Sequence, residues 1–502
     1  MPINIREIDY TGSEDNLSLD YTVLVFGPRP KKWVWDKPEE HELQPKQDTE
    51  KYRLFKSLTE WNDYLKLGTD DTKGSEAHEE YVNKLDSSGN LQFETWGDSG
   101  KKYITDKKNF GFLTASECLR YGLSVLYVFD DIFKYSDGKI TCTFDMETFA
   151  DKGRFNLRFI TGGSIRPEDL SKTTVKYGNN ESMPLDKALL EIAAERGDCT
   201  SLIDETGSTT EIESRVNGIN EDGHHTTPLY QYAAEKIIAK GTDPSWTRSE
   251  VRGKYGRIWA PYGLMEVLPF VFDLTADGQS NGYWSKDLTS LPDVPASLAF
   301  LCTFGYWVIT NPVKTYNPWY AIAGSERGVC PNKFIPNHEY GDADIKVLQT
   351  RAPEKEGHIA VNVISKVEPF GYILYGNRTM LPLSAPENGK SKKVQLVASS
   401  YANIRELCNS IKKVAYQAAR KYTFEPNNLL LWFKYRNELL PILETAKNDN
   451  GCKDYEVTPK DTKMKALLLA DINIIKPIEG VEDFDLTMGL FDDEQDLQFI
   501  EE

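Results

Sequence analysis

Apolar runs alternate with amphipathic segments in the middle of this chain, and this alternation limits the folds that it can adopt. The run Ser124–Phe129 predicts a buried strand, and a second strand is expected at 154–161. Apolar residues at 185, 189 and 192 fall on one face of a helix, and a short strand at 199–204 follows it. Strand, helix and strand in this order predict a βαβ unit, so we expect an α/β domain.

The same alternation continues along the chain. A helix is expected at 230–240, a strand at 257–260 and another helix at 297–307. We therefore predict that a middle α/β domain spans residues 111–345.

The charge balance argues against one broad class of function. Lys and Arg number 59 against 77 Asp and Glu, a net charge of −18, which is unfavourable for a protein whose main partner is nucleic acid. Charge is also unevenly spread, because 32 of the 83 residues from 28 to 110 are charged. We expect residues 21–110 to be the start of the body with an exposed, weakly structured insertion that holds some packed aromatic residues.

Nothing in the sequence indicates membrane insertion or secretion. The longest uncharged stretch, 294–313, has the length of a membrane span, but Pro295 and Pro312 interrupt its ends, so we interpret it as a buried core helix. Residues 1–9 contain acids where a secretory signal needs a basic start. The seven cysteines include no Cys-x-x-Cys pair, which indicates a reduced, cytoplasmic folding compartment.

The pattern changes in the C-terminal part, where we predict an α+β domain over 346–480. The second of its two helices contains Pro441, which should kink or split it. The expected elements are strands at 359–364, 372–375 and 467–475 and helices at 400–421 and 428–447.

Both ends of the chain carry the period-two pattern of β-strands. We predict an N-terminal arm over 1–20 and an acidic C-terminal arm over 481–502, which holds nine acids and no base. A solvated acidic tail is the alternative. Such strands need a sheet edge to pair with, in their own domain or in another chain. The apolar positions of the arms are Ile3, Ile5, Phe484, Leu486, Met488 and Leu490.

Motifs of enzymes and metal sites are incomplete. Residues 389–391 imitate the end of a phosphate-binding loop, but Ser384 stands where the first Gly is needed. Residues 273–278 lack ligands of a calcium loop, and His338 with Glu339 lacks the second His of a zinc protease helix. We therefore predict no catalytic residue, no cofactor and no metal.

One further enzyme hypothesis stays open. Cys199 with His224 or His225 would supply the nucleophile and base of an α/β hydrolase. The two histidines lie in a stretch rich in Gly, Asn, Asp and Thr, for which a surface loop is the simpler interpretation.

Five segments of the second half of the chain form a motif set: Asn317-Pro-Trp-Tyr-Ala-Ile-Ala-Gly-Ser-Glu-Arg-Gly328, Val361-Asn-Val-Ile364, Phe370-Gly-Tyr-Ile-Leu-Tyr-Gly-Asn-Arg-Thr379, Tyr401-Ala-Asn-Ile-Arg405 and Tyr422-Thr-Phe-Glu-Pro-Asn427. In order and spacing, these segments resemble motifs of the contractile tail sheath proteins of bacteriophages. Weaker matches at 2–7, 198–204 and 291–297 extend the resemblance over most of the chain. One departure is Glu406, where the family has a second Arg.

The resemblance implies a structural protein and no enzyme. Such subunits form hexameric rings stacked helically around a tail tube, and the polymer contracts to drive the tube through a bacterial envelope for genome delivery. Terminal arms add strands to the C-terminal domain's sheet in adjacent rings. The implied partners are other copies of the chain, the tail tube, the baseplate and the tail terminator, without contact with nucleic acid or membrane insertion. The implied location is the virion, after assembly in the host cytoplasm; a tailocin or extracellular injection particle is the alternative machine.

The resemblance also suggests roles for charged residues of the C-terminal domain. A basic cluster on its long helix would face an acidic tube surface, or else form a solvated helix face. This cluster comprises Lys412, Lys413, Arg420 and Lys421. Buried or interface ion pairs are expected of Arg378, Arg405 and Glu425.

Overall fold

The structure is a computed structural model, and it describes residues 21–27, 31–37, 42–45, 50–65, 77–80, 94–95, 102–103, 110–129, 132–136, 139–162, 173–178, 181–218, 227–235, 251–267, 270–274, 280–284, 293–349, 358–382, 398–460 and 469–479. The predicted arms at 1–20 and 481–502 lie outside these ranges, as do His224, His225 and residues 389–391.

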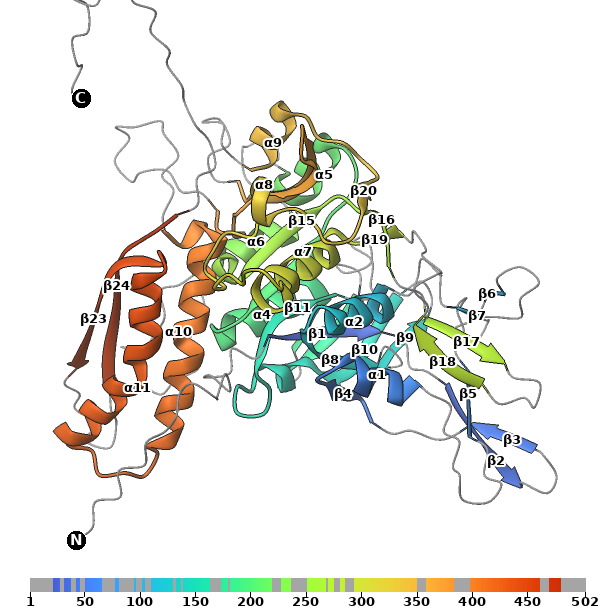
Figure 1. The fold of residues 1–502 in the computed structure, drawn as a ribbon, viewed down its shortest axis with the longest axis horizontal. Helices are drawn as coiled ribbons and strands as arrows, with labels where there is room; N and C mark the ends of the chain where they lie inside the picture. The colour runs from blue at the N-terminus through green and yellow to red at the C-terminus, as the bar shows by residue number, and fades with distance from the viewer. Residues whose placement is uncertain are drawn as a thin grey trace, which may run out of the picture.

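An eight-stranded sheet forms the centre of the body (Figure 1). Its six inner strands are parallel, and an antiparallel strand closes each edge. The inner strands are almost wholly buried, as expected of a parallel sheet that is covered on both faces. In spatial order the strands are β22 (Gly371–Tyr375), β21 (Val361–Val367), β15 (Gly256–Ala260), β14 (Thr200–Asp204), β11 (Leu157–Thr161), β1 (Thr22–Gly27), β8 (Ser124–Phe129) and β4 (Tyr52–Phe55).

Helices cover both faces of this sheet. Successive side chains of β1 point to opposite faces of the sheet and lie in different hydrophobic core clusters. Val23 lies in the cluster that contains α2 (Phe110–Arg120) and α7 (Ala296–Gly305), whereas Leu24 lies in the one that contains α4 (Leu185–Arg196).

The uncharged stretch is a core helix, as predicted. Every residue of α7 is buried, and a π-helical turn at Tyr306–Thr310 follows it. Within the ranges given above, no helix is long and apolar enough to cross a membrane.

The predicted βαβ unit is confirmed with one difference. Strands β11 and β14 pair in parallel, and α4 lies between them in the chain. A pair of strands missed by the sequence analysis precedes α4, because their short, mixed polar and apolar pattern resembles that of a loop. They belong to a four-stranded sheet of β13 (Glu181–Pro184), β12 (Thr173–Tyr177), β10 (Lys139–Asp145) and β9 (Phe133–Ser136).

The remaining elements of the body are short. Helices α5 (Thr209–Asn217), α6 (Pro228–Ala234) and α9 (Asp342–Leu348) contribute to a third cluster beside β15 and β21. The others are α8 (Gly324–Arg327), the 3-10 turns Met146–Ala150, Arg252–Tyr255 and Ala398–Ser400, and a sheet of β19 (Asp293–Val294), β16 (Gly263–Met265) and β20 (Phe334–Pro336).

The charged interval 28–110 contributes packed aromatic residues to the core, as predicted. Phe55 of β4 and Trp61 and Tyr64 of α1 (Leu58–Leu65) are buried in the central cluster, because aromatic residues are concentrated there between the charges. Two small sheets also draw on this interval. They contain β2 (Lys31–Lys37), β3 (Glu42–Pro45) and β5 (Ala77–Glu80), and β6 (Glu94–Thr95), β7 (Lys102–Tyr103), β17 (Phe270–Leu274) and β18 (Ser280–Trp284).

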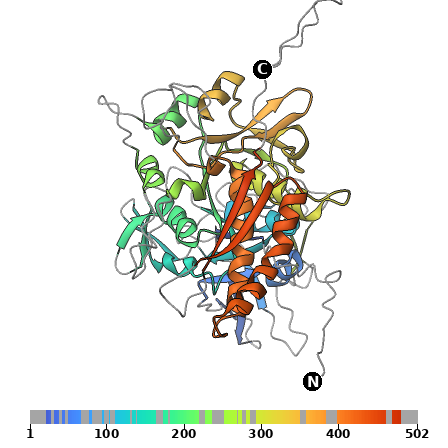
Figure 2. The ribbon, with the colours of Figure 1, turned by 90° about the vertical axis from the view of Figure 1, so that its left-hand side faces the viewer.

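Two long helices and a hairpin form a C-terminal module beside the body (Figure 1 and Figure 2). Strand β23, which the sequence analysis missed, pairs antiparallel with β24. Pro441 does not split the second helix, which runs continuously through it. The module consists of α10 (Ala402–Lys421), α11 (Leu429–Asn448), β23 (Cys452–Lys460) and β24 (Leu469–Pro477).

The predicted domain boundary at 346 does not coincide with the end of the central sheet. Strands β21 and β22 follow this position but pair with β15 and with each other. Their pairing partners lie far away in the sequence, so the local pattern did not assign them to the body.

Candidate assembly interface

Helix α10 crosses the amino-terminal ends of three parallel strands, and Glu406 is the centre of this contact. Its carboxylate lies 2.6 Å from Arg158 of β11 and 2.5 Å from Arg257 of β15. The Thr200 hydroxyl at the start of β14 donates to it at 2.8 Å. None of these three charged residues is more than 4% exposed. The residue that departs from the sheath motif therefore joins α10 to three strands of the body.

A second charged contact lies further along α10. The Lys413 ammonium donates to Asn156 Oδ1 at 2.7 Å and lies 3.5 Å from the Asp198 carboxylate. Arg196 also pairs with Asp198, at 3.0 Å. Burial lowers the pKa of Lys413 to about 8. Although burial opposes it, the cations Lys413 and Arg196 lower the pKa of Asp198.

These charges fix the module to the body. Removing one partner of a buried ion pair costs about 3–5 kcal/mol, because the other charge is left uncompensated. Glu406, Ser410 and Lys413 recur at positions i, i+4 and i+7, so they form a polar stripe beside the apolar one. This second periodicity is the signal in the sequence that α10 carries a polar contact face, although it does not identify the partners of that face.

The predicted basic cluster is not a single exposed surface, and for Lys413 the prediction is wrong. Its ammonium is buried against the body and cannot face a tube. Lys412 donates to the Tyr255 hydroxyl at 3.1 Å. Only Arg420 and Lys421 are exposed, and Lys421 pairs with Glu438 at 2.8 Å. The four cations lie on two sides of α10, and the amphipathic pattern of the sequence did not show which of them are buried and which are exposed.

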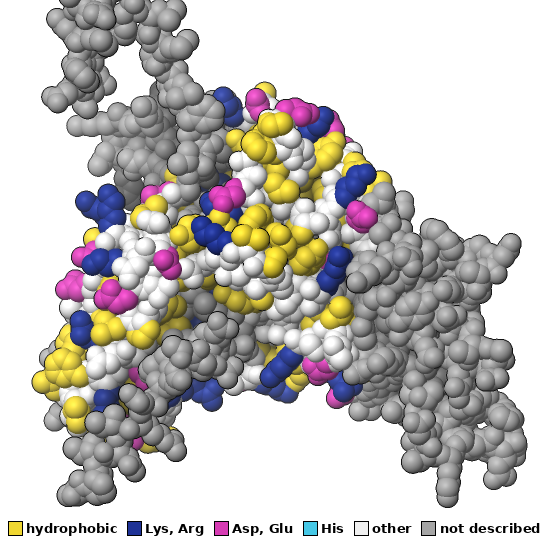
Figure 3. Space-filling view, viewed as in Figure 1, with side chains coloured by type: hydrophobic (Ala, Val, Ile, Leu, Met, Phe, Trp, Pro, Cys, Tyr) yellow, Lys and Arg dark blue, Asp and Glu magenta, His cyan; other side chains and the backbone are white. Residues whose placement is uncertain are grey.

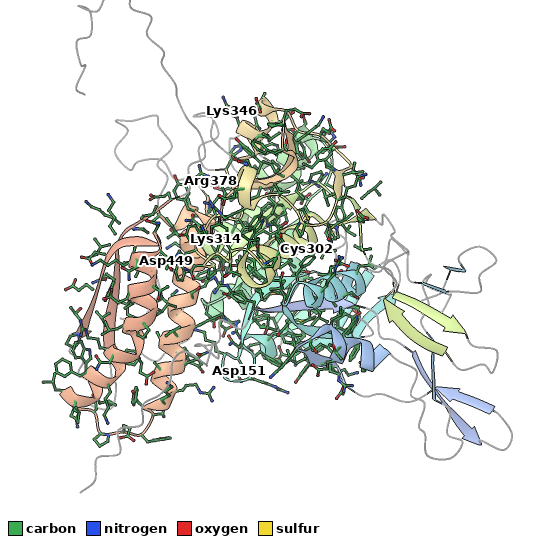
Figure 4. The ribbon with its side chains drawn as sticks, viewed as in Figure 1. Asp151, Cys302, Lys314, Lys346, Arg378 and Asp449 are labelled. Carbon is green, nitrogen blue, oxygen red and sulfur yellow. The ribbon has the colours of Figure 1, made fainter. Side chains whose placement is uncertain are left out.

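Two of the three residues expected in ion pairs are buried. The Arg378 guanidinium lies 5.0 Å from the ring centre of Tyr401, at the junction of α10 and the body (Figure 4). Arg405 donates to Asn409 at 2.9 Å. Glu425 is exposed.

Asparagine side chains connect four of the five motif segments at this junction. Asn362 of the second segment accepts a bond from the Arg378 backbone of the third at 2.8 Å. Asn377 of the third segment donates to Asn403 of the fourth at 2.8 Å, and Asn403 donates to the Trp319 carbonyl of the first at 3.3 Å. Segments scattered over almost ninety positions of the chain therefore meet in one hydrogen-bonded network.

The same junction holds the end of α11. Asn317 donates to the Asp449 carboxylate at 2.7 Å, and the Trp319 indole donates to the Asp449 carbonyl at 3.2 Å. Asp449 accordingly lies between the module and the body in Figure 4. Trp319 is buried in the core of the module.

The hairpin of the module offers open edges. Among the described residues, β23 and β24 pair only with each other, so one edge of each strand keeps its backbone groups available. Ile475 of β24 is a large apolar residue with 39% of its surface exposed. An added strand from outside the described residues would find main-chain partners here.

The end of the module opposite the junction is apolar and exposed (Figure 3). We call this surface, where α10 and α11 meet, the apolar tip. Phe424 is fully exposed there, although its fellow aromatic Trp432 is buried. The exposed apolar residues of the tip are Phe424, Leu429, Leu430 and Phe433.

No protein-family model matches the sequence, and no curated protein matches it either. The chain is similar to the sheath complex of an extracellular contractile injection system, PVC, in its contracted state, with 12% identity over 76% of this chain and 80% of that chain and a TM-score of 0.44. It is similar to the baseplate of the anti-feeding prophage in its contracted state, with 13% identity over 95% and 94% and a TM-score of 0.44. A crystal structure of a sheath tail protein from Desulfitobacterium hafniense has 9% identity over 73% and 87% and a TM-score of 0.33. Two of these three neighbours are described in a contracted state, and the third as a sheath tail protein.

The hydrolase hypothesis gains no geometric support. Cys199 is completely buried beside Arg196 and Lys413, and burial raises the pKa of its thiol to about 11. A thiol in this position is a poor nucleophile because it is rarely ionised and has no access to substrate. Within the described residues, no group of three or more His, Cys, Asp and Glu side chains is arranged to hold a metal ion.

Proposed function

We propose that this chain is the structural subunit of a contractile tail sheath, and that its copies form hexameric rings stacked helically around a tail tube. The observation that carries the proposal is the convergence of the sheath-like motif segments on one junction, where Asn377 and Asn403 bond each other. That junction holds a hairpin with open edges on a rigid body. The role is mechanical and requires no catalytic residue.

In this proposal, copies of the chain are joined by donated strands. The arm residues Ile3 and Ile5 at one end, and Phe484 to Leu490 at the other, have the alternation that strand addition needs. Main-chain hydrogen bonds give such a joint strength, and alternate apolar side chains fix its register. The joint persists while other interfaces between the subunits break and form again during contraction.

The buried charges of α10 support a subunit that moves as one body. Glu406 and Lys413 hold α10 to the strands of the central sheet, and α10 packs on α11, which packs on β23 of the hairpin. Displacement of the body is therefore passed on to any strand that the hairpin has accepted. Contraction would then drive the tube through the bacterial envelope for genome delivery. Its partners would be the tube, the baseplate and the tail terminator, in a virion assembled in the host cytoplasm.

Negative-stain electron microscopy of the purified chain tests this function. We expect tubes or stacked rings from the full chain and only monomers from a chain that lacks residues 481–502. Uniform small particles from both proteins would contradict self-assembly through the C-terminal arm.

The same subunit would serve in a tailocin or another extracellular injection particle. The junction and the open hairpin are equally suited to that machine, and the genes that surround this one distinguish the two.

A further inference from the structure

The backbone at the apolar tip holds an aromatic side chain in solvent at a cost. Phe424 follows the last turn of α10 with a φ of 73°, in the left-handed region that Gly and Asn adopt most easily. Its ring nevertheless is fully exposed and contributes nothing to the core of the subunit. Because Gly or Asn would end the helix with less strain, the Phe side chain is best explained by contact with something outside the described residues.

The apolar tip is well ordered in its own hydrogen bonds. Asn428 caps α11 by accepting the Leu431 amide at 2.9 Å. The cap leaves Leu429 and Leu430 in the first turn, where both are about two-thirds exposed. The exposed leucines therefore belong to a fixed surface and not to a frayed helix end.

Cations outnumber acids in the chain segment that contains this apolar surface. Residues 416–438 contain four cations and two acids, and the acid Glu438 is already paired with Lys421. The cations are Arg420, Lys421, Lys434 and Arg436. An acidic partner with apolar side chains would complement both properties of the tip.

The direction of the hairpin strands determines which end of an added strand lies near the apolar tip. Strand β23 begins just after α11 ends and therefore runs back toward the tip, and antiparallel β24 runs away from it. A strand added antiparallel to β24 runs toward the tip again. Each strand holds one proline, and charged side chains, which protect an edge, are more frequent in β23 than in β24, so the β24 edge is the more open of the two.

We propose that the apolar tip is the docking site for residues 491–502 of a second copy, whose preceding residues 484–490 are added to β24. This inference rests on the proposed function and names the residues that recognise the accepted strand. Residues 491–502 contain six acids and no base, together with Phe491, Leu497, Phe499 and Ile500. Their charge and apolar side chains match those of the tip.

The lengths are compatible with this placement. Seven residues of added strand cover roughly 24 Å, and α10, which has 20 residues, is roughly 30 Å long. The twelve residues that follow can extend by up to about 40 Å, so they cover the remaining distance and the tip.

Photo-crosslinking in the assembled full chain tests the inference. A photoreactive benzoyl-phenylalanine replaces Phe424 in one variant and Phe370, a half-exposed residue between β21 and β22, in a matched control. We expect crosslinks from position 424 to residues 491–502 of another copy, located by mass spectrometry, and none from position 370. The crosslinks should weaken as salt is raised, because part of the attraction is between exposed charges.

The outcomes separate the two proposals. Tubes that give no crosslink from position 424 to 491–502, or crosslinks only to other segments, would overturn the inference and leave the proposed function intact. A repeat with the photoreactive group at position 430 covers the case in which the first variant fails to assemble. A chain that ends at Leu490 should still form tubes, but at a higher protein concentration than the full chain; unchanged assembly would also overturn the inference. If the full chain forms no tubes or rings, both proposals fail.

Discussion

The two ends of α10 reverse the usual distribution of side chains. Near its start, Glu406 is 2% exposed and bonded to two arginines, whereas just beyond its end the Phe424 ring is fully exposed. Charges normally lie outside and aromatic residues inside, so both arrangements call for an explanation. The difference teaches that one end of the helix is fixed within the subunit, while the other presents an apolar surface to solvent, which in our proposal contacts another copy of the chain.

Breaking the charged end should have the largest effect. Glu406→Ala leaves Arg158 and Arg257 buried without their carboxylate, so we expect the free energy of unfolding to fall by about 3–5 kcal/mol. Urea denaturation of the unassembled subunit measures this change. The control is Glu425→Ala at the exposed end, which should change stability by less than about 0.5 kcal/mol. Equal effects of the two substitutions would show that the buried carboxylate does not hold the junction.

The pH dependence of stability tests the second charged contact. The folded pKa of Lys413, about 8, is below its ordinary value of 10.5, so the folded state binds fewer protons than the unfolded state between these values. Stability should therefore rise with pH from about 8 to 10.5, by about 3 kcal/mol at most from this group.

The measurement compares urea denaturation of the natural chain and of Lys413→Met across this pH range. Subtracting the two pH profiles of the free energy of unfolding isolates the contribution of Lys413 from that of the tyrosines, which titrate in the same pH range. If the two proteins respond to pH in parallel, the ammonium is not buried in the folded state.

The two ends of α10 also differ in how far the sequence predicts them. The helix itself was predicted to within two residues at each end, because Ile404, Leu407 and Ile411 follow one stripe and are buried as expected. The buried charges were not predicted, since Glu406 and Arg158 are 248 residues apart and no local pattern pairs them. Sequence periodicity thus gives the elements, whereas the junction depends on which strands the topology brings together.

Strand pairing shows the same limit. Strands β21 and β22 were expected from their composition, but their place in the central sheet follows only from the parallel pairing of β21 with β15. The exposed tip was not predicted for a different reason. The local sequence 422–427 does not show whether the Phe424 side chain is buried or exposed, because its exposure depends on the folded backbone.

A substitution at the tip should separate stability from assembly. Phe424→Asn replaces an exposed ring by a residue that adopts positive φ readily, so the isolated subunit should be unchanged or stabilised by up to about 1 kcal/mol. Assembly into tubes should nevertheless weaken, which electron microscopy over a series of protein concentrations measures. Loss of stability with unchanged assembly would mean that the ring serves the fold after all.

The smallest effect is expected from the charges that border the tip. Lys421 pairs with Glu438 at 2.8 Å, but 55% of the Lys421 side chain is exposed, so water and salt screen the pair. Lys421→Ala should lower the free energy of unfolding by less than about 0.5 kcal/mol. The same substitution should reduce assembly at low salt more than at high salt, because it removes one of the cations available to an acidic segment.

Arg252, which pairs with Glu191 and Glu235 on the body, provides the control. Arg252→Ala should cost more stability than Lys421→Ala without changing how assembly responds to salt, and if it changes that response equally, general electrostatics and not the tip would govern the contact.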